Sequence, residues 1–246
     1  MGEQIGKAVA ATLYYAPKEE FERVRGLNGI SPTARALLFA DLCRVNTLYM
    51  VARAGSGHIG SSFSSMEILV HLHLDVLGDD DVFFSSKGHD APGLYSLLIA
   101  LGRLPFEKIH GLRRIGGLPG HPDVSVPGMV INSGSLGQGI SKAKGMVRAD
   151  RLEGRTHRYF VLTGDGELQE GQIWESLISA ANEKMGEITV IVDHNKLQSD
   201  YAVALTSDLG DLCAKFASFG WHVARSDGHD IGALASALAS GASDCN

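Results

Sequence analysis

The chain has 246 residues, enough for one large α/β domain or two small ones with a substantial core. Its 22 Lys and Arg against 28 Asp and Glu leave a net charge of −6, and Arg113-Arg114 is the only tight basic cluster, which argues against a nucleic-acid-binding protein. No apolar run approaches the roughly 18 residues of a membrane-spanning helix, so we expect no membrane association. The dispersed Cys43, Cys213 and Cys245 predict reduced thiols and a cytoplasmic location.

The first 32 residues are weakly patterned, because prolines and glycines interrupt any long element. We interpret residues 1–32 as an N-terminal extension that wraps the domain or touches a partner, and residues 33–246 as the domain itself. Over residues 33–54 apolar side chains recur every three or four positions, which predicts an amphipathic helix. A second helix is predicted over residues 64–77, after a glycine-rich loop.

The middle of the chain alternates short apolar runs with glycine-rich loops. Residues 82–84 predict a short buried strand that enters the loop at residues 85–90, and a helix follows over residues 92–101. Residues 102–136 are rich in glycine and proline, and a further helix is predicted over residues 139–151.

The clearest strand signal is the apolar run at residues 159–163, which meets Gly164-Asp165-Gly166 and then a helix predicted over residues 170–185. A second apolar run, at residues 188–192, meets Asp193-His194-Asn195 at its carboxyl end. Two parallel strands joined by a crossover helix fit this spacing, so we predict an α/β fold with a parallel sheet flanked by helices. Two further elements are predicted downstream, a strand over residues 221–224 and a helix over residues 231–238.

Oxygen-bearing side chains follow both of these strands. Asp165 and Asn195 lie at the carboxyl ends, where open parallel sheets bind ligands. Their oxygens suit a Mg²⁺ ion that bridges the protein to a bound diphosphate. Gly164 and Gly166 would let the backbone approach those phosphates, and the crossover helix directs its N-terminus there. Gly-Asp-Gly alone is nevertheless a common turn.

Five motifs together are far more specific than this turn. In chain order they are Ser56-Gly57-His58, Ser86-Lys87-Gly88-His89, Gly120-His121-Pro122, Gly134-Ser135-Leu136-Gly137-Gln138-Gly139 and Gly164-Asp165-Gly166-Glu167-Leu168-Gln169-Glu170-Gly171. These motifs, in this order, resemble those of the N-terminal domain of the transketolase family, and the resemblance runs from about residue 35 to residue 230. Gly-Asp-Gly followed by Asn195 resembles the thiamine diphosphate signature. The length is most similar to the N-terminal subunit of a split transketolase. The resemblance implies the diphosphate-binding domain of the thiamine diphosphate-binding fold.

The resemblance also implies which residues hold the cofactor and its metal. The cofactor-binding residues would be His89, near the diphosphate, together with Gly134, Ser135, Leu136, Asp165, Gly166, Glu167 and Asn195. A Mg²⁺ ion, or Ca²⁺ or Mn²⁺ in its place, would be held by Asp165, by the amide oxygen of Asn195 and by a backbone carbonyl that maps to Leu197.

His58 and His121 are expected to face the substrate as catalytic residues. Ketol transfer forms and destroys alkoxides on sugar carbons, and imidazole near pH 7 can donate and accept those protons. A lone loop histidine more often satisfies backbone groups, but three histidines in glycine-rich loops favour a functional role. Glu170 resembles a family glutamate at the subunit boundary, with a helix N-terminal carboxylate as the equal alternative. Lys87 is expected to reach either a phosphate or solvent.

A partner chain is a further implication of the resemblance. In the family, a glutamate from a second domain contacts the pyrimidine ring of the cofactor. We therefore expect a two-polypeptide enzyme, inactive without a second subunit that carries the pyrimidine-binding and C-terminal domains, and a heterotetramer with two copies of each subunit. The sequence departs from the family pattern at Ile59 and Ser135, where many members have Pro, and it stops before a late family loop that carries another histidine.

The leading hypothesis is transfer of a two-carbon ketol unit from a ketose or ketose phosphate to an acceptor, dependent on thiamine diphosphate and Mg²⁺. The acceptor is either a sugar phosphate or a lipoyl group or thiol on an acyl carrier protein, which would make the protein a loading enzyme of a biosynthetic pathway. A 2-oxo acid decarboxylating subunit shares the Gly-Asp-Gly and Asn pattern. A non-catalytic scaffold predicts loss of the metal ligands, but Asp165 and Asn195 are both present.

Overall fold

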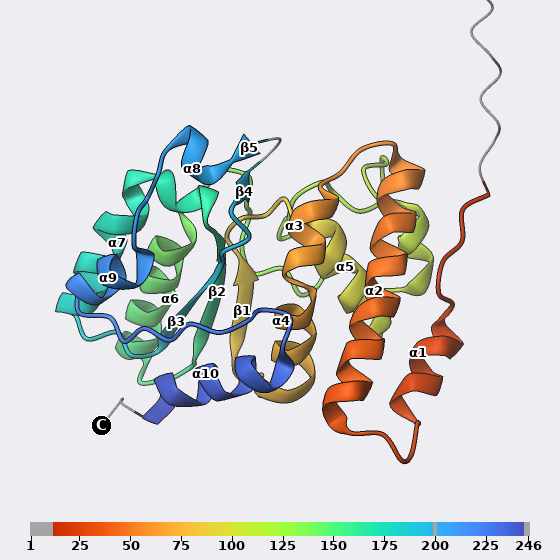
Figure 1. Cartoon of the computed structure of the whole chain (residues 1–246), viewed down its shortest axis with the longest axis horizontal. Coiled ribbons are helices and arrows are strands. Elements are labelled where there is room, and N and C mark those ends of the chain that lie inside the picture. Colours follow the sequence, from red (N-terminus) through yellow and green to blue (C-terminus); the bar gives the residue numbers. More distant parts are fainter. Residues whose placement is uncertain (1–11, 199–200, 244–246) are drawn as a thin grey trace, which may run out of the picture.

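The computed structural model describes residues 12–198 and 201–243 of the chain (Figure 1). At its centre lies a parallel sheet with the strand order β1 (Val82–Ser85), β2 (Tyr159–Gly164), β3 (Ile188–Asp193). The register pairs Ser85 with Leu162 and Gly164 with Asp193. The strands therefore end at one common edge, as the sequence predicts for the runs at residues 82–84, 159–163 and 188–192.

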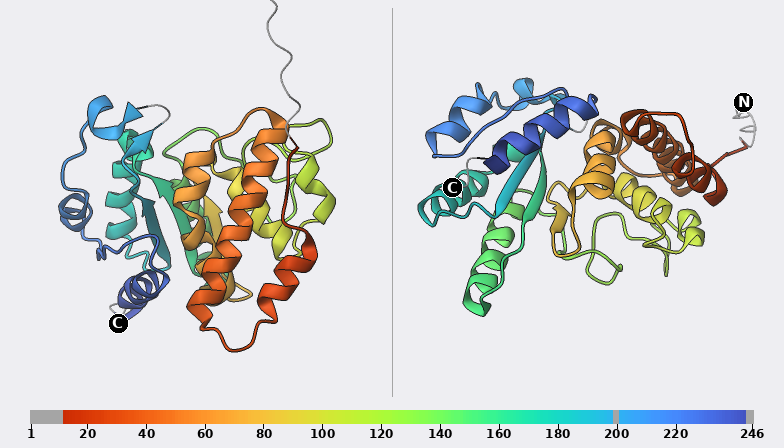
Figure 2. Two further views of the ribbon diagram at one scale, coloured as in Figure 1. Left: turned by 45° about the vertical axis from the view of Figure 1, so that its right-hand side comes forward. Right: turned by 90° about the horizontal axis from the view of Figure 1, so that it is seen from below.

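The central strand β2 is buried along its whole length. Phe160 and Leu162 face one apolar core, and Tyr159 and Val161 face another, because successive side chains of a strand point to opposite faces. Helices lie on both sides of the sheet (Figure 2). A strand that is buried on both faces is typical of α/β proteins and explains the unbroken apolar run in its sequence.

Ten α-helices lie in the described part of the chain. Their bounds are α1 (Lys18–Arg25), α2 (Pro32–Ala54), α3 (Ile59–Ser64), α4 (Met66–His71), α5 (Ala91–Ala100), α6 (Gly139–Glu153), α7 (Gly171–Asn182), α8 (Val203–Thr206), α9 (Leu212–Ser218) and α10 (Ile231–Ser243). Short helical turns occupy Leu72–Val76, Phe106–His110 and Gly166–Gln169, and a small antiparallel pair joins β4 (Leu197–Gln198) to β5 (Tyr201–Ala202). The helices predicted over residues 33–54, 92–101, 139–151, 170–185 and 231–238 are confirmed within a few residues.

The helix predicted over residues 64–77 is interrupted in the structure. It begins earlier as α3, breaks at Ser65, continues as α4 and ends in the π-helical turn Leu72–Val76. The Ser62 hydroxyl donates to the carbonyl of His58 at 3.0 Å, and the Ser65 hydroxyl donates to the carbonyl of Ser61 at 2.9 Å. Such bonds from serine compete with regular helix, which explains the break.

The strand predicted over residues 221–224 is wrong, because this segment forms no ladder. Its apolar residues pack instead: Trp221 and Val223 contact the core beside β3. The Trp221 indole donates to the carbonyl of Leu177 at 3.1 Å, which anchors the segment to α7. Side-chain packing rather than strand pairing thus accounts for its apolar sequence.

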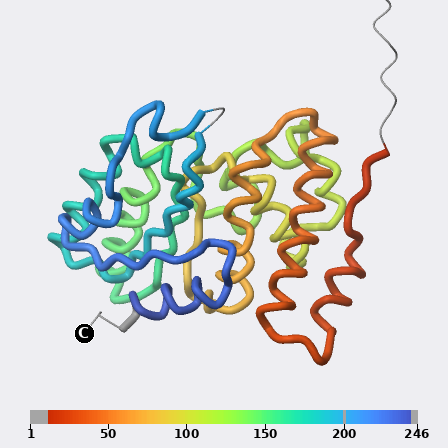
Figure 3. Tube along the Cα trace, in the orientation of Figure 1, coloured from red at the N-terminus to blue at the C-terminus, as the bar shows by residue number. Residues whose placement is uncertain are grey.

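Residues 12–31 of the predicted N-terminal extension pack against α2. The buried Asn46 accepts from the amide of Ala16 at 2.7 Å and donates to its carbonyl at 3.1 Å, and the rings of Phe21 and Phe39 lie 5.1 Å apart. Figure 3 shows α1 running beside α2. The division between residues 32 and 33 stays a prediction, and residues 1–11 of the extension lie outside the described residues.

Two of the cysteines can be placed. Cys43 and Cys213 are free thiols, whereas Cys245 lies outside the described residues. Burial raises the pKa of the Cys43 thiol to about 12, so it is unreactive at neutral pH. Within the described ranges, no helix has both the length and the apolar character to cross a membrane.

The contact between α6 and β2 can be tested by substitution. A Cβ at Gly139 would overlap the side chain of Ser86 and stand 3.0 Å from Val161, so we expect Gly139→Ala to lower the free energy of unfolding by roughly 1–3 kcal/mol. Gly145 lies in the same helix with nothing within 4 Å of a Cβ, so Gly145→Ala should raise it by roughly 0.5–1 kcal/mol. Urea denaturation measures both values, and equal stability of the two variants would contradict the packing described.

Candidate functional site

Asp165 lies at the carboxyl edge of the sheet, directly after β2, and is 2% exposed. Its Oδ1 accepts from the amide of Gly166 at 2.8 Å, and its Oδ2 accepts from the amide of Lys196 at 2.6 Å. The second bond joins the end of β2 to the loop after β3. Burial raises the pKa of Asp165 above its ordinary value, because desolvation of the carboxylate outweighs the hydrogen bonds that it accepts from the amides of Lys196 and Gly166. A bound cation would offset this desolvation.

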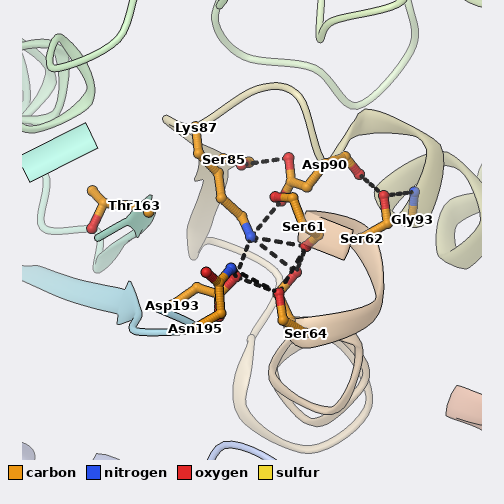
Figure 4. Close-up of polar contacts among 12 residues, drawn as sticks. Ser61, Ser62, Ser64, Ser85, Lys87, Asp90, Gly93, Thr163, Asp193 and Asn195 are labelled. Carbon is orange, nitrogen blue, oxygen red and sulfur yellow. Dashed lines mark hydrogen bonds and ion pairs between the residues drawn. The ribbon is translucent and has the colours of Figure 1, made fainter. Parts of the chain in front are cut away.

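The predicted metal ligands Asn195 and Leu197 flank Lys196 in this loop. Lys196 has a φ of 64°, which turns the chain sharply beside Asp165. The Asn195 Oδ1 accepts from the amide of Leu197 at 2.8 Å, and its Nδ2 donates to Asp193 at 3.2 Å (Figure 4). The structure therefore brings all three predicted ligand residues to one loop junction.

The donors at this junction suit a hard cation. Among residues 12–198 and 201–243, no group of three or more His, Cys, Asp or Glu side chains could hold a metal ion. The donors of the proposed site are instead mixed: a carboxylate from Asp165, an amide from Asn195 and the backbone carbonyl of Leu197. All are oxygens, and Mg²⁺ typically takes one or two protein carboxylates or amides and completes its octahedron with phosphate oxygens and water.

Two glycine-rich loops pack against each other beside this junction. Gly88 has a φ of 57°, and a Cβ there would overlap Ser133 and approach the amide of Gly134 to 3.4 Å. Gly134 has a φ of 124° and nothing within 4 Å of a Cβ position, so its backbone is open to a ligand. Ser135 is exposed and accepts from the side chain of Gln138 at 3.0 Å, and Leu136 is half-buried. The predicted cofactor residues Gly134, Ser135 and Leu136 thus form one loop ahead of α6.

Glu167 holds these segments together. Its buried carboxylate accepts from the Ser86 hydroxyl, from the amide of Gly137 at 2.8 Å and from the amide of Gly164 at 3.2 Å. Burial raises its pKa. The side chain is therefore engaged by the protein itself, and the predicted contact of Glu167 with the cofactor stays a prediction. At Gly166, beside it, a Cβ would stand 2.6 Å from Oε1 and 2.9 Å from Cβ of Gln198, so this position is closed to larger residues.

The three motif histidines lie at the same edge of the sheet. The rings of His58 and His89 meet edge to face, with centroids 5.3 Å apart. Burial lowers the pKa of His89 and of His121, and for His121 the nearby positive charge of Arg113 lowers it further. Both imidazoles are therefore neutral at pH 7 and able to accept a proton.

Arg113 was recognisable in the sequence only as half of a basic pair. Its φ is 55°, and its guanidinium donates to the hydroxyl of Ser56 at 2.5 Å, in the loop that carries His58. A Cβ at Gly120 would stand 2.8 Å from the Arg113 Nε, so the cation lies directly beside the loop of His121. No spacing signal in the sequence links the loop of His58 to the loop of His121, because residues 59–119 separate them.

Neither position expected for Lys87 matches the structure. The side chain is 1% exposed, so it does not face solvent. Its ammonium lies 2.7 Å from Asp193 Oδ2, 3.0 Å from the carbonyl of Ser61 and 3.3 Å from the Ser65 hydroxyl, so its three N–H donors are all engaged within the protein (Figure 4). Glu170 is exposed and precedes α7 without capping it through its side chain, and its role stays open.

Residues 36–245 match a family model described as transketolase, thiamine diphosphate binding domain. The chain is 35% identical to the 6-deoxy-6-sulfo-D-fructose transketolase subunit of Clostridium sp. (strain MSTE9), over 81% of this chain and 76% of that protein. It is 36% identical to an apulose-4-phosphate transketolase subunit of Actinobacillus succinogenes, over 75% of this chain and 71% of that protein.

A solved structure gives the same likeness. Transketolase from Campylobacter jejuni superposes with a TM-score of 0.77 at 29% identity and covers 84% of this chain. The match takes in 35% of that longer chain, so the present chain corresponds to about a third of it. The predicted fold class, a parallel sheet flanked by helices in a thiamine diphosphate-binding domain, is confirmed.

The electrostatics of His121 give a direct test. We expect NMR titration of the ring protons to place its pKa below the ordinary value of about 6.5. Arg113→Gln should move this pKa upward, because a positive charge that disfavours the imidazolium is removed, but not fully to the ordinary value, because burial remains. Arg114→Gln is the matched control, since Arg114 donates to the carbonyl of Arg53 and should leave His121 unchanged. An unshifted His121 in Arg113→Gln would contradict this account.

Proposed function

Because the chain belongs to the transketolase family, we propose that the carboxyl edge of its sheet binds thiamine diphosphate through Mg²⁺ and that this site serves the transfer of a two-carbon ketol unit. The observation that carries the proposal is the hydrogen bond from the Lys196 amide to Asp165. Because Asn195 and Leu197 flank Lys196, this bond brings the three residues with the predicted oxygen ligands together. The glycine-rich loops and the three histidines lie at the same edge of the sheet.

The residues of the chain have distinct proposed roles. Asp165, the Asn195 amide oxygen and the Leu197 carbonyl hold the metal ion, and His89, Gly134, Ser135, Leu136, Gly166 and Glu167 surround the cofactor. When bound, thiamine diphosphate supplies the nucleophilic carbon that carries the two-carbon unit. His58 and His121 move protons at the sugar hydroxyls, and the lowered pKa of His121 keeps it ready to accept one.

The enzyme is proposed to work as two polypeptides. The relatives named above are themselves called transketolase subunits, which supports a partner chain. We assign the pyrimidine-binding and C-terminal domains to that partner, and two copies of each chain to a heterotetramer. In this chain, residues 33–246 form the cofactor domain, residues 1–32 are its extension, and the thiols stay reduced in the cytoplasm.

A sugar that carries an anionic group is the proposed substrate class. The names of the two relatives, a sulfo-fructose and an apulose phosphate enzyme, contain ketoses with an anionic group, which supports such a ketose as the donor of the two-carbon unit. They give no support to the carrier-protein and 2-oxo acid alternatives. Release of carbon dioxide from pyruvate, or loading of a carrier protein, would overturn this choice.

Cofactor binding is the first test. We expect isothermal titration with thiamine diphosphate and Mg²⁺ to show binding that is tightest when the polypeptide encoded beside this chain is present. Asp165→Asn should weaken it at least tenfold, about 1.4 kcal/mol, because an amide replaces a charged metal ligand. Asp41→Asn, at an exposed carboxylate on α2, is the control and should bind like the unsubstituted chain. Undiminished affinity in a folded Asp165→Asn variant would refute the site.

Catalysis by His121 is tested separately from binding. We expect His121→Ala to lower kcat of ketol transfer by about 10²–10⁴ with little change in thiamine diphosphate affinity, as for loss of a general acid or base. Steady-state kinetics and cofactor titration on the same preparation measure both quantities. An equal loss in both would place His121 against the cofactor rather than the sugar.

A further inference from the structure

A buried network lies behind the proposed metal ligands. Lys87 comes from the loop after β1 and Asp193 from the end of β3, and both are at least nine-tenths buried. The Lys87 ammonium donates to Asp193 Oδ2 at 2.7 Å, to the Ser61 carbonyl at 3.0 Å and to the Ser65 hydroxyl at 3.3 Å. An ammonium has three donors, so these bonds use all of them and leave none for a phosphate.

Asp193 connects this ammonium to Asn195. Its Oδ2 accepts from Lys87, from the Ser64 hydroxyl at 2.6 Å and from the Asn195 Nδ2 at 3.2 Å (Figure 4). The carboxylate at Asp90 also faces Lys87, with its Oδ2 3.9 Å from the ammonium. One cation thus serves two buried carboxylates, and it lies closer to the one that contacts Asn195.

The hydrogen bonds of Asp193 decide which end of the Asn195 amide faces the site. Asp193 Oδ2 accepts from Lys87 and Ser64, and the NH₂ end of Asn195 turns toward it as a further donor. The oxygen end is then directed to the amide of Leu197, at 2.8 Å, in the loop that Asp165 also binds. A flipped amide would present two N–H donors where a metal ion requires an oxygen.

A buried ion pair needs a reason other than stability. The free-energy cost of desolvating two charges often exceeds the energy of their mutual attraction. Replacing both residues by well-packed apolar ones therefore commonly leaves the stability of the fold unchanged or raises it. Partners behind the ligands, in contrast, orient them and typically change metal affinity by 10–100-fold.

We propose that Lys87 and Asp193 are positioning residues that set the amide orientation of Asn195 and thereby the metal affinity of the site. The inference rests on the proposed function, because it needs a metal at Asp165 and Asn195. Lys87 fixes Asp193 through their 2.7 Å hydrogen bond, and Asp193 in turn holds the oxygen of Asn195 toward the metal position. The same lysine anchors the loop of His89, whose amide donates to the Lys87 carbonyl at 2.5 Å.

The test separates metal affinity from fold stability. We would titrate the full chain, with its partner polypeptide, with MnCl₂ at saturating thiamine diphosphate, and measure thermal unfolding without metal. Asp193→Asn should weaken Mn²⁺ binding about 10–100-fold. The double variant Lys87→Met/Asp193→Leu removes both charges, so its melting temperature should lie near that of the unsubstituted chain while Mn²⁺ binding stays weak.

An exchange variant gives the conservative rescue. In Asp193→Asn/Asn195→Asp, a carboxylate at position 195 presents oxygen in either orientation, so Mn²⁺ affinity should recover relative to Asp193→Asn. Arg44→Met breaks the part-buried ion pair with Glu67 between α2 and α4, and it should lower the melting temperature without changing Mn²⁺ affinity.

Two results would overturn the inference. The first is a Mn²⁺ affinity that falls in proportion to the melting temperature in all variants, Arg44→Met included. The pair of Lys87 and Asp193 would then act only on the stability of the fold. The second is normal affinity in Asp193→Asn. If the unsubstituted complex itself bound no Mn²⁺ with thiamine diphosphate, the proposed function would fail and the inference with it, a result distinct from the other two.

Discussion

The buried carboxylate of Glu167 is the interaction on which the arrangement of the site depends. It joins Ser86 after β1, Gly137 before α6 and Gly164 at the end of β2. Each of these segments carries residues assigned to the cofactor, so one side chain sets their mutual spacing. Without the carboxylate, buried backbone amides would lose their acceptor, and an unsatisfied buried donor costs about 1–3 kcal/mol.

Parallel pairing explains why distant motifs meet. Because β1, β2 and β3 run in one direction, the loops that follow them, with His89, Asp165 and Asn195, emerge at one edge. These strands and this edge could be predicted from sequence, since buried parallel strands are continuous apolar runs that end in polar turns. The same rule failed at Trp221, where an apolar run packs on a helix instead of pairing. Periodicity does not distinguish these two uses of apolar residues.

The contacts of the residues behind the site could not be predicted from the sequence. The motif position of Lys87 gave no sign of its burial, because the groups around it, Ser61 and Asp193, come from segments far along the chain. Arg113 is a similar case, since it meets Ser56 through the fold rather than through spacing. Sequence motifs identified candidate residues that would touch a ligand, whereas the residues that orient them depend on tertiary packing that no local pattern encodes.

The two buried carboxylates at the sheet edge, Asp193 and Asp165, have different kinds of partner. Lys87 lies behind Asp193 and compensates it, whereas Asp165 is buried with backbone amides as its partners and has a raised pKa. A raised carboxyl pKa means that ionised Asp165 destabilises the folded chain relative to its protonated form, and this penalty is present at neutral pH and vanishes as the group is protonated. A divalent cation would offset the same penalty without protonation. The fold thus pairs Asp193, the carboxylate that orients a ligand, with a lysine, whereas Asp165, at the proposed metal position, has backbone amides as its hydrogen-bond partners.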